Sequence, residues 1–180
     1  QPGTQICITF HRGSFKASAT QARKPLLMIA PGTGVAPMRS LIWERMTWRT
    51  ESDGLSPFGE AVLIFGGRNS KKDFLYRADW QLRELDVKVL TAWSRDQKEK
   101  IYVQDVVRAE AEMIWRLLVL DGGSVFVCGS SGKMPAGVRA AIVDAFEMVG
   151  KKADWEYSKE KAEEEVSRIE KEGRYVQETW

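Results

Sequence analysis

The chain has 180 residues, of which 43% are hydrophobic and 29% charged, and its formal net charge is +2. A chain of this size buries one substantial core, so we expect one domain with a terminal appendage. The near-neutral charge, without a long block of one sign, argues against a general nucleic-acid binder. No apolar run approaches the roughly 18 residues of a membrane span and no leader pattern occurs, so no membrane segment is expected.

Strand-like and helix-like patterns alternate along the chain. Residues 5–10 repeat apolar side chains at period two, as a strand does. Buried strands are predicted at residues 26–30, 61–66, 87–93 and 124–128, with a C-terminal strand at 174–180. Helices are predicted at residues 36–49, 73–85, 103–120 and 135–149, and 154–172 is expected to form a charged surface helix. This order predicts an α/β fold, a doubly wound, Rossmann-like parallel sheet of five strands with helices on both faces.

A glycine-rich turn is the most informative local feature. The segment 26–37, LLMIAPGTGVAP, runs from an apolar strand through the turn into a helix. Gly32 and Gly34 permit positive φ and close backbone approach, and the amides and dipole of the following helix attract an anion. Pro37 suits a first helical turn. The segment predicts a phosphate cradle, although an ordinary strand-to-helix connection has the same pattern.

A second polar cluster follows the strand at residues 87–93. Ser94 offers a hydroxyl, Arg95 a planar fork for phosphate, Lys100 a point charge and Tyr102 a phenolic donor. Together they predict a pocket for a 2′-phosphate. The alternative is a solvated loop, because charges alternate between residues 95 and 100.

Ligands of open parallel sheets bind at the carboxyl ends of the strands. Gly32, Arg68, Ser94 and Cys128 are all predicted to follow strand ends, so we expect them to converge on one crevice. NAD-specific folds place an acid on the ribose about 20 residues after the glycine turn. The candidate surroundings here are cationic, so NADPH is expected rather than NADH.

The two cysteines, Cys7 and Cys128, lie in strand-like contexts and are expected to be buried free thiols of a reducing, cytoplasmic compartment. Neither has a companion at ligand spacing, so no metal site is expected. His11 has no partner in the sequence and is interpreted as a linker residue. The chain starts at Gln1 rather than at a methionine, so we expect a piece of a longer protein.

Several motifs occur in a characteristic order: Pro-Gly-Thr-Gly-Val-Ala-Pro, Phe-Gly-Gly-Arg68, Asp73-Phe-Leu-Tyr, Ser94-Arg, Lys100-x-Tyr-x-Gln, Val-Cys128-Gly and a terminal aromatic. They resemble the NADP(H)-binding module of the ferredoxin–NADP⁺ reductases. Lys100-x-Tyr-Val-Gln and an acid two residues before a terminal tryptophan are similar to the diflavin reductases, which include microsomal cytochrome reductase, sulfite reductase flavoprotein and nitric oxide synthase. Cys128-Gly-x₄-Met-Pro and the ending Glu178-Thr-Trp favour the branch that serves cytosolic iron–sulfur protein assembly.

The resemblance implies contacts for each part of the dinucleotide. The pyrophosphate would lie in the turn formed by Gly32, Thr33, Gly34, Val35, Ala36 and Pro37. The 2′-phosphate would be held by Ser94, Arg95, Lys100 and Tyr102. Arg68 would lie beside the adenosine and its phosphates, Gln104 at the adenine end, and Gly129 and Met134 along the nicotinamide half.

Three residues are implied in the reaction itself. Cys128 would stand near the reacting carbon of the nicotinamide, and Glu178 matches a terminal acid that assists hydride transfer through polar contacts. Trp180 would stack over the flavin and move aside for nicotinamide, because two aromatic planes compete for one face. The alternatives from the residues alone are a packing cysteine, an ordinary surface carboxylate and a loose or plugging tail. Similarly, Arg68 could simply pair with Asp73.

The implied activity is hydride transfer from NADPH to FAD, then through FMN to a protein acceptor such as an iron–sulfur assembly protein. FAD-binding motifs do not occur in these 180 residues, so turnover is not expected without the FAD domain. Residues 1–24 would end that domain, 25–150 form the NADP(H)-binding domain, and 151–180 the charged helix and terminal strand.

Alternatives remain open. They are another diflavin reductase, a non-redox NADP(H)-sensing module, or an NADH-type single-flavin module, which the cluster of Ser94, Arg95 and Lys100 disfavours. Two positions depart from the family pattern. Met38 replaces the usual aromatic residue, which alters helix packing. Ser130 stands where many relatives have aspartate, which removes a carboxylate from the hydride-transfer end.

Overall fold

The computed structural model describes residues 3–9, 13, 15, 21–51 and 58–180. Its centre is a sheet of five parallel strands in the order β3-β2-β1-β4-β5. The strands are β1 (Leu26–Pro31), β2 (Ala61–Gly67), β3 (Val87–Trp93), β4 (Ser124–Gly129) and β5 (Tyr175–Thr179). The chain moves outward from β1 to β3 and then returns to the other side of β1, which confirms the predicted doubly wound α/β fold.

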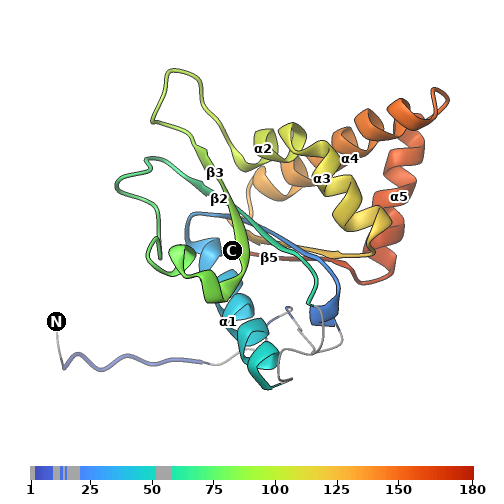
Figure 1. Cartoon of the computed structure of the whole chain (residues 1–180). Helices are drawn as coiled ribbons and strands as arrows, with labels where there is room; N and C mark the ends of the chain where they lie inside the picture. Colours follow the sequence, from blue (N-terminus) through green and yellow to red (C-terminus); the bar gives the residue numbers. More distant parts are fainter. Residues whose placement is uncertain (1–2, 10–12, 14, 16–20, 52–57) are drawn as a thin grey trace.

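Helices cover both faces of the sheet (Figure 1). The helices are α1 (Val35–Glu51), α2 (Val103–Ala109), α3 (Ala111–Trp115), α4 (Met134–Ala153) and α5 (Lys159–Lys171). Helix α1 packs on one face, and α2 to α5 pack on the other. No helix in the described part of the chain is both long enough and apolar enough to cross a membrane.

Alternation along each strand divides the core into two clusters. In β1, Leu27 and Ile29 pack against α2 to α5, whereas Met28 and Ala30 pack against α1. Both sets are buried, so the strand has no polar face and its sequence is a continuous apolar run, as parallel strands covered on both sides require.

The charged C-terminal helix lies within the segment predicted for it, but it begins at Lys159 and residues 154–158 are not helical. Ser158 precedes α5 and its hydroxyl accepts a hydrogen bond from the Lys161 amide, which determines where the helix begins. The thin apolar stripe of Ala162, Val166 and Ile169 is buried in the same cluster as α4. This packing brings the chain back to the sheet, where β5 joins β4.

The predicted helix at residues 73–85 was wrong. This segment forms turns and two short 3₁₀ helices, η3 (Asp79–Gln81) and η4 (Arg83–Leu85). Tyr76 has a φ of 55°, which an α-helix excludes, and the Trp80 indole donates a hydrogen bond to the carbonyl of Leu75. Phe74 packs between Phe65 and Trp93, with ring centroids 5.3 and 5.4 Å away. This tertiary packing outweighs the approximate helical spacing of the apolar residues.

Other expectations need smaller corrections. Strand β3 is at the edge of the sheet and only Ala92 in it is fully buried, so the prediction of a buried strand was wrong there. The predicted helix 103–120 is interrupted at Glu110 and ends in a π-helical turn, η5 (Arg116–Leu120).

The amino-terminal segment also differs from its prediction. Residues 5–9 are exposed and form no strand, since no described strand lies beside them to complete a ladder, and Cys7 is therefore exposed rather than buried. Phe10 and His11 lie outside the described residues.

Candidate functional site

The carboxyl ends of all five strands meet at one edge of the sheet. The pairing partners there are Pro31 with Gly66, Gly67 with Trp93, and Gly129 with Thr179. The segments that follow these strands therefore leave the sheet side by side, on the left in Figure 1. They begin with Gly32, Arg68, Ser94, Ser130 and Trp180.

The glycine turn after β1 forms a 3₁₀ turn, η2 (Gly32–Gly34), that leads into α1. Gly32 has a φ of +60° and is exposed, in line with the expected positive φ. Gly34 needs to be glycine for a different reason, because a Cβ there would lie 2.0 Å from the carbonyl oxygen of Cys128. The close approach is to β4, and it holds the turn directly over the end of that strand.

Within this turn the predicted contacts differ in accessibility. Gly32, Thr33 and Ala36 are exposed, and Pro37 is the third residue of α1. The side chain of Val35 is buried, and its amide already donates to the carbonyls of Gly32 and Thr33. Val35 therefore supports the turn from below rather than facing a ligand.

The loops that follow β2 and β3 are joined by hydrogen bonds. The Ser94 amide donates to the Gly67 carbonyl at 3.0 Å, and the Arg95 amide donates to the Arg68 carbonyl at 2.8 Å. Farther out, the Ser70 amide donates to a carboxylate oxygen of Asp96 at 2.9 Å. The backbones that carry the two predicted arginines are therefore adjacent.

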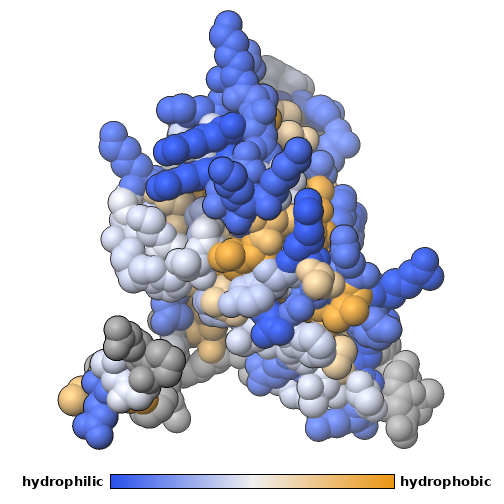
Figure 2. Space-filling model, turned by 90° about the vertical axis from the view of Figure 1, so that its left-hand side faces the viewer, coloured by the Kyte–Doolittle hydropathy of each residue, from blue (hydrophilic) through white to orange (hydrophobic). Residues whose placement is uncertain are grey.

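Arg68, Arg95 and Lys100 are exposed, and none forms an ion pair with a residue that the structure describes. The alternative pair of Arg68 with Asp73 is not formed, and the Asp73 carboxylate accepts the Asn69 amide at 2.8 Å. Figure 2 shows this side of the molecule with long hydrophilic side chains gathered over its upper half and hydrophobic patches below them. Positive charge without an internal partner suits an anionic ligand.

The remaining predicted dinucleotide contacts lie around the starts of α2 and α4. Tyr102 immediately precedes α2 and is 45% exposed. Gln104 faces α4, since a Cβ at Gly137 would lie 3.9 Å from its side-chain nitrogen. A Cβ added at Gly129 would lie 3.2 Å from the Met134 methyl group. The structure therefore brings Met134 to the end of β4 and places Gln104 beside the first turns of the same helix.

Cys128 and Glu178 are register partners in the β4–β5 pair. Cys128 belongs to the cluster on the α1 face, as does Val176, two residues before Glu178, so both site residues lie on that face. Burial, and then the negative charge of Glu178, raise the pKa of the Cys128 thiol to about 11. The thiol is therefore neutral at physiological pH and is not a thiolate nucleophile.

The terminal residue is held by its backbone. The Trp180 amide donates to the Gly129 carbonyl at 3.1 Å, and its own oxygen accepts the Ser131 amide at 2.9 Å. Its side chain is 58% exposed. The backbone is therefore anchored beside the end of β4 while the indole faces outward, which differs from a loose tail.

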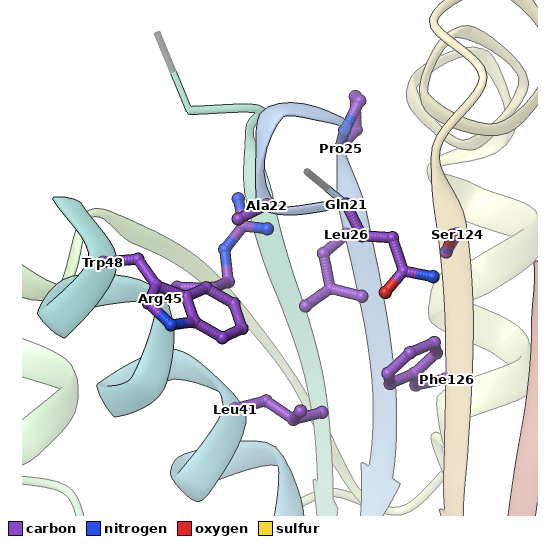
Figure 3. Close-up of a pocket in the computed structure, with 9 residues that line it drawn as sticks. All are labelled: Gln21, Ala22, Pro25, Leu26, Leu41, Arg45, Trp48, Ser124 and Phe126. Atoms are coloured by element: carbon purple, nitrogen blue, oxygen red, sulfur yellow. The ribbon is translucent and has the colours of Figure 1, made fainter. Parts of the chain in front are cut away.

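A separate hollow lies at the opposite edge of the sheet, between α1 and the starts of β1 and β4 (Figure 3). Among the described residues that line it, Arg45 is the charged one; it is 9% exposed and donates a 2.6 Å hydrogen bond to the Gly59 carbonyl. Burial lowers the pKa of Arg45 to about 10, so it stays cationic. Arg45 tethers the approach to β2 and is remote from the motif residues. Among the described residues, no group of three or more potential metal ligands gathers anywhere.

The sequence analysis missed two residues at the carboxyl edge of the sheet, Ser70 and Asp96. They are 26 positions apart, and neither belongs to a motif that signals the other. Only the pairing of β2 with β3 brings them together, so the nearest available signal was the position of each just after a strand.

Comparison with known proteins agrees with this geometry. The sequence model of the oxidoreductase NAD-binding domain matches residues 28–140, which include the glycine turn, both cationic loops and β4. The chain belongs to the oxidoreductase NAD-binding domain family. This confirms the family resemblance that the ordered motifs indicated.

Curated relatives of this NAD-binding domain are oxidoreductases by name. The chain is 43% identical, over its full length, to NADPH-dependent diflavin oxidoreductase 1 of Emericella nidulans, of which it covers 29%. It is 38% identical to the Arabidopsis thaliana protein of the same name, over 97% of this chain and 28% of that protein. It is also 38% identical to the sulfite reductase [NADPH] flavoprotein alpha-component of Neisseria meningitidis, over 88% of this chain and 25% of that protein.

The chain thus spans between a quarter and a third of the length of these relatives. Its family consists of nicotinamide-dinucleotide-binding domains. The names of the relatives refer to NADPH and to flavins.

Proposed function

We propose that this chain is the NADPH-binding module of a diflavin oxidoreductase, which delivers hydride from NADPH to FAD for onward transfer through FMN to a protein acceptor. The observation that carries the proposal is a set of three cations that form no ion pair with any residue the structure describes. These are Arg68, Arg95 and Lys100, held beside an exposed glycine turn at the carboxyl edge of the sheet. A dinucleotide with an extra phosphate needs both features.

The donors present fit such a dinucleotide. The turn from Gly32 to Pro37 would receive the pyrophosphate, and Arg68 would lie beside the adenosine. The hydroxyl of Ser94, the fork of Arg95, the ammonium of Lys100 and the phenol of Tyr102 would hold the 2′-phosphate. Gln104 would contact the adenine end, and Gly129 and Met134 would line the nicotinamide half. Each of these residues ends a strand, lies on a segment that follows a strand end, or begins a helix at this edge.

At the reacting end, NADPH when bound supplies the hydride and FAD accepts it. Cys128 contributes a neutral thiol in a dry position, and Glu178 contributes a carboxylate on the same face. The exposed Trp180 side chain would stack over the flavin, which is bound mainly by another domain, and would leave that face when nicotinamide enters.

The finer assignment concerns partners and location. Residues 1–24 would connect to an FAD domain, 25–150 would bind NADP(H), and 151–180 would return Glu178 and Trp180 to the sheet. The acceptor would be a protein of cytoplasmic iron–sulfur cluster assembly, in keeping with the branch that the motifs resemble and with relatives named NADPH-dependent diflavin oxidoreductase 1. The match to a sulfite reductase flavoprotein supports a second candidate, a diflavin reductase with a different acceptor. A non-redox sensor is disfavoured, because it needs neither Glu178 nor an exposed terminal indole.

The test is calorimetric titration of this chain with NADP⁺, NAD⁺ and 2′-phospho-AMP. We expect binding of NADP⁺ and 2′-phospho-AMP and little binding of NAD⁺. Tighter binding of NAD⁺ than of NADP⁺, or binding of none of the three even after addition of the FAD domain, would contradict the proposal. Reduction of FAD by NADPH in the full-length protein, lost on removal of Trp180 and Glu178, would separate a redox module from a sensor.

A further inference from the structure

Asp96 is an acid in the middle of the cationic edge. It directly follows Ser94 and Arg95, where the proposed ligand carries its extra phosphate. A carboxylate at this position repels a phosphate, so on charge alone it should weaken binding. Its presence there calls for a physical account.

The Asp96 carboxylate is engaged by the neighbouring loop. One of its oxygens accepts the amide of Ser70 at 2.9 Å. Hydrogen bonds from the Ser70 hydroxyl and amide, aided by the nearby charge of Lys71, lower the pKa of Asp96 and keep it ionised. Its negative charge is therefore directed at the loop after β2.

This bond reaches beyond the backbone ladder. The ladder between β2 and β3 is extended past the strands by the bond from the Ser94 amide to Gly67 and by the bond from the Arg95 amide to Arg68. The Ser70–Asp96 bond lies two positions farther along the first loop. It is therefore a further link between the two segments, beyond Arg68 and Arg95.

Each of the two loops is also braced internally. In the first, the Asp73 carboxylate accepts the Asn69 amide, and the Asn69 side-chain oxygen accepts the amides of Lys71 and Lys72 at 3.0 and 3.2 Å. In the second, the Gln97 side-chain amide donates to the carbonyls of Trp93 and Glu99 at 2.5 and 2.7 Å. The Ser70–Asp96 bond therefore joins two pieces that are already stiff.

We infer that Asp96 is a positioning residue for recognition of the 2′-phosphate: by binding Ser70 it holds the loops after β2 and β3 together and so sets the separation of Arg68 and Arg95. The inference rests on the proposed function of this edge as a dinucleotide phosphate site. A planar guanidinium needs correct orientation to bind phosphate bidentately, so a change in loop separation reduces the binding of the phosphate more than that of the rest of the ligand.

The two possible roles of Asp96 predict opposite changes in the affinity for phosphate ligands when Asp96 is replaced, so one variant distinguishes them. If Asp96 acted only as a charge, Asp96→Ala would bind phosphate ligands more tightly or unchanged. If it positions the arginines, Asp96→Ala binds NADP⁺ and 2′-phospho-AMP about fivefold more weakly, with a change in NAD⁺ affinity below about twofold. Calorimetric titration of the 180-residue chain measures all three ligands.

Three companion variants define the controls. Glu99→Gln removes an equal charge from the same loop without touching Ser70, and its affinities should stay unchanged or rise slightly. Asp96→Asn keeps an acceptor oxygen for Ser70 and should recover most of the lost affinity. Ser70→Ala keeps the amide donor and should lose about twofold. If Asp96→Ala fails to fold, as judged by circular dichroism, the comparison of Ser70→Ala with Glu99→Gln decides.

Two results would overturn the inference: unchanged or tighter binding of 2′-phospho-AMP by Asp96→Ala and Ser70→Ala, or an equal loss for NADP⁺ and NAD⁺. Either result would leave the proposed function intact, since that function depends on whether the unaltered chain binds NADP⁺ more tightly than NAD⁺. Absence of NADP⁺ binding by the unaltered chain, also after addition of the FAD domain, would instead contradict the proposed function.

Discussion

Arginine has different surroundings in two regions of this molecule. Between α4 and α5, Arg139 donates to Glu170 at 2.8 Å and to Glu163 at 2.6 Å, and these bonds raise its pKa. At the carboxyl edge, Arg68 and Arg95 are exposed and form no ion pair with any described residue. The first region matches its charges within the fold, and the second leaves them unmatched.

The difference separates charge that is balanced inside the fold from charge that is available to a ligand. A paired arginine contributes to packing two helices and has little free energy left for an external anion, whereas an unpaired arginine beside a backbone turn can bind one. The comparison therefore predicts that substitutions in the two regions affect different measurements. Four experiments, from the largest expected effect to the smallest, test this separation.

The largest effect, on the free energy of unfolding, is expected at Gly34. At this position the carboxyl edge is closely packed, although its arginines are unpaired among the described residues. A Cβ at this position would lie 2.0 Å from the carbonyl oxygen of Cys128, and backbone cannot move aside cheaply. Gly34→Ala should lower the free energy of unfolding by about 3 kcal/mol, measured by urea denaturation. Gly32→Ala is the matched control, because its Cβ meets no atom within 4 Å and only its φ of +60° is strained, which costs about 1 kcal/mol. Equal losses in the two variants would contradict this account.

Arg95 tests the unmatched region. Arg95→Ala should weaken NADP⁺ binding about tenfold, the size expected for loss of a charge-assisted hydrogen bond to phosphate, and should narrow the preference over NAD⁺. Its free energy of unfolding should hardly change, because the side chain is exposed and forms no ion pair with a described residue. The measurements are calorimetric titration and urea denaturation of the same samples. Equal weakening for NADP⁺ and NAD⁺ would refute the assignment of Arg95 to the 2′-phosphate.

Arg139 tests the matched region and serves as the counterpart of Arg95. Arg139→Ala should lower the free energy of unfolding by about 1 kcal/mol, a modest value because its partners are partly exposed. NADP⁺ affinity should stay within about twofold of the unaltered chain. Arg139→Lys keeps the charge but not the planar fork, so its free energy of unfolding should lie between those of the unaltered chain and Arg139→Ala. A large loss of NADP⁺ affinity in Arg139→Ala would show that the two regions are not independent.

The smallest effect is expected at Cys128 and depends on pH. Its folded pKa of about 11 is above the ordinary value of 9.0, so the stability contributed by the neutral thiol is fully present below pH 9.0 and is lost as the pH rises through about 11. Cys128→Ala should remove this part of the pH dependence from the free energy of unfolding. At neutral pH, iodoacetamide should modify the exposed Cys7 and spare Cys128 in the folded chain, as measured by peptide mass spectrometry. Rapid modification of Cys128 under these conditions would contradict its burial.

Sequence reasoning succeeded where the signal was local. The apolar run of β1 and the glycines after it identified a strand, a turn and a helix without reference to any other segment, since burial on both faces and positive φ at Gly32 each select for particular residue types. The same holds for the stripe of Ala162, Val166 and Ile169, which has the period of a helix and is buried along one side.

It failed where distant residues compete with local preference. Residues 73–85 have near-helical spacing, yet Phe74 is drawn into a cluster with Phe65 and Trp93, and the backbone turns at Tyr76 instead. The exposed segment around Cys7 shows the reverse case, a strand-like pattern without a strand to pair with among the described residues.

By itself, the sequence determined the fold class, the glycine turn and the cationic character of the segment after β3, because hydrophobic period, backbone permissiveness and charge are properties of neighbouring residues. Only the tertiary structure decided which side chains meet. It paired Cys128 with Glu178, placed the Cys128 carbonyl against Gly34 and tied Ser70 to Asp96. It also left Arg68 and Arg95 without an ion pair to any described residue. These contacts join residues that are distant in sequence, and their energies depend on the order of the strands in the sheet, which no local pattern encodes.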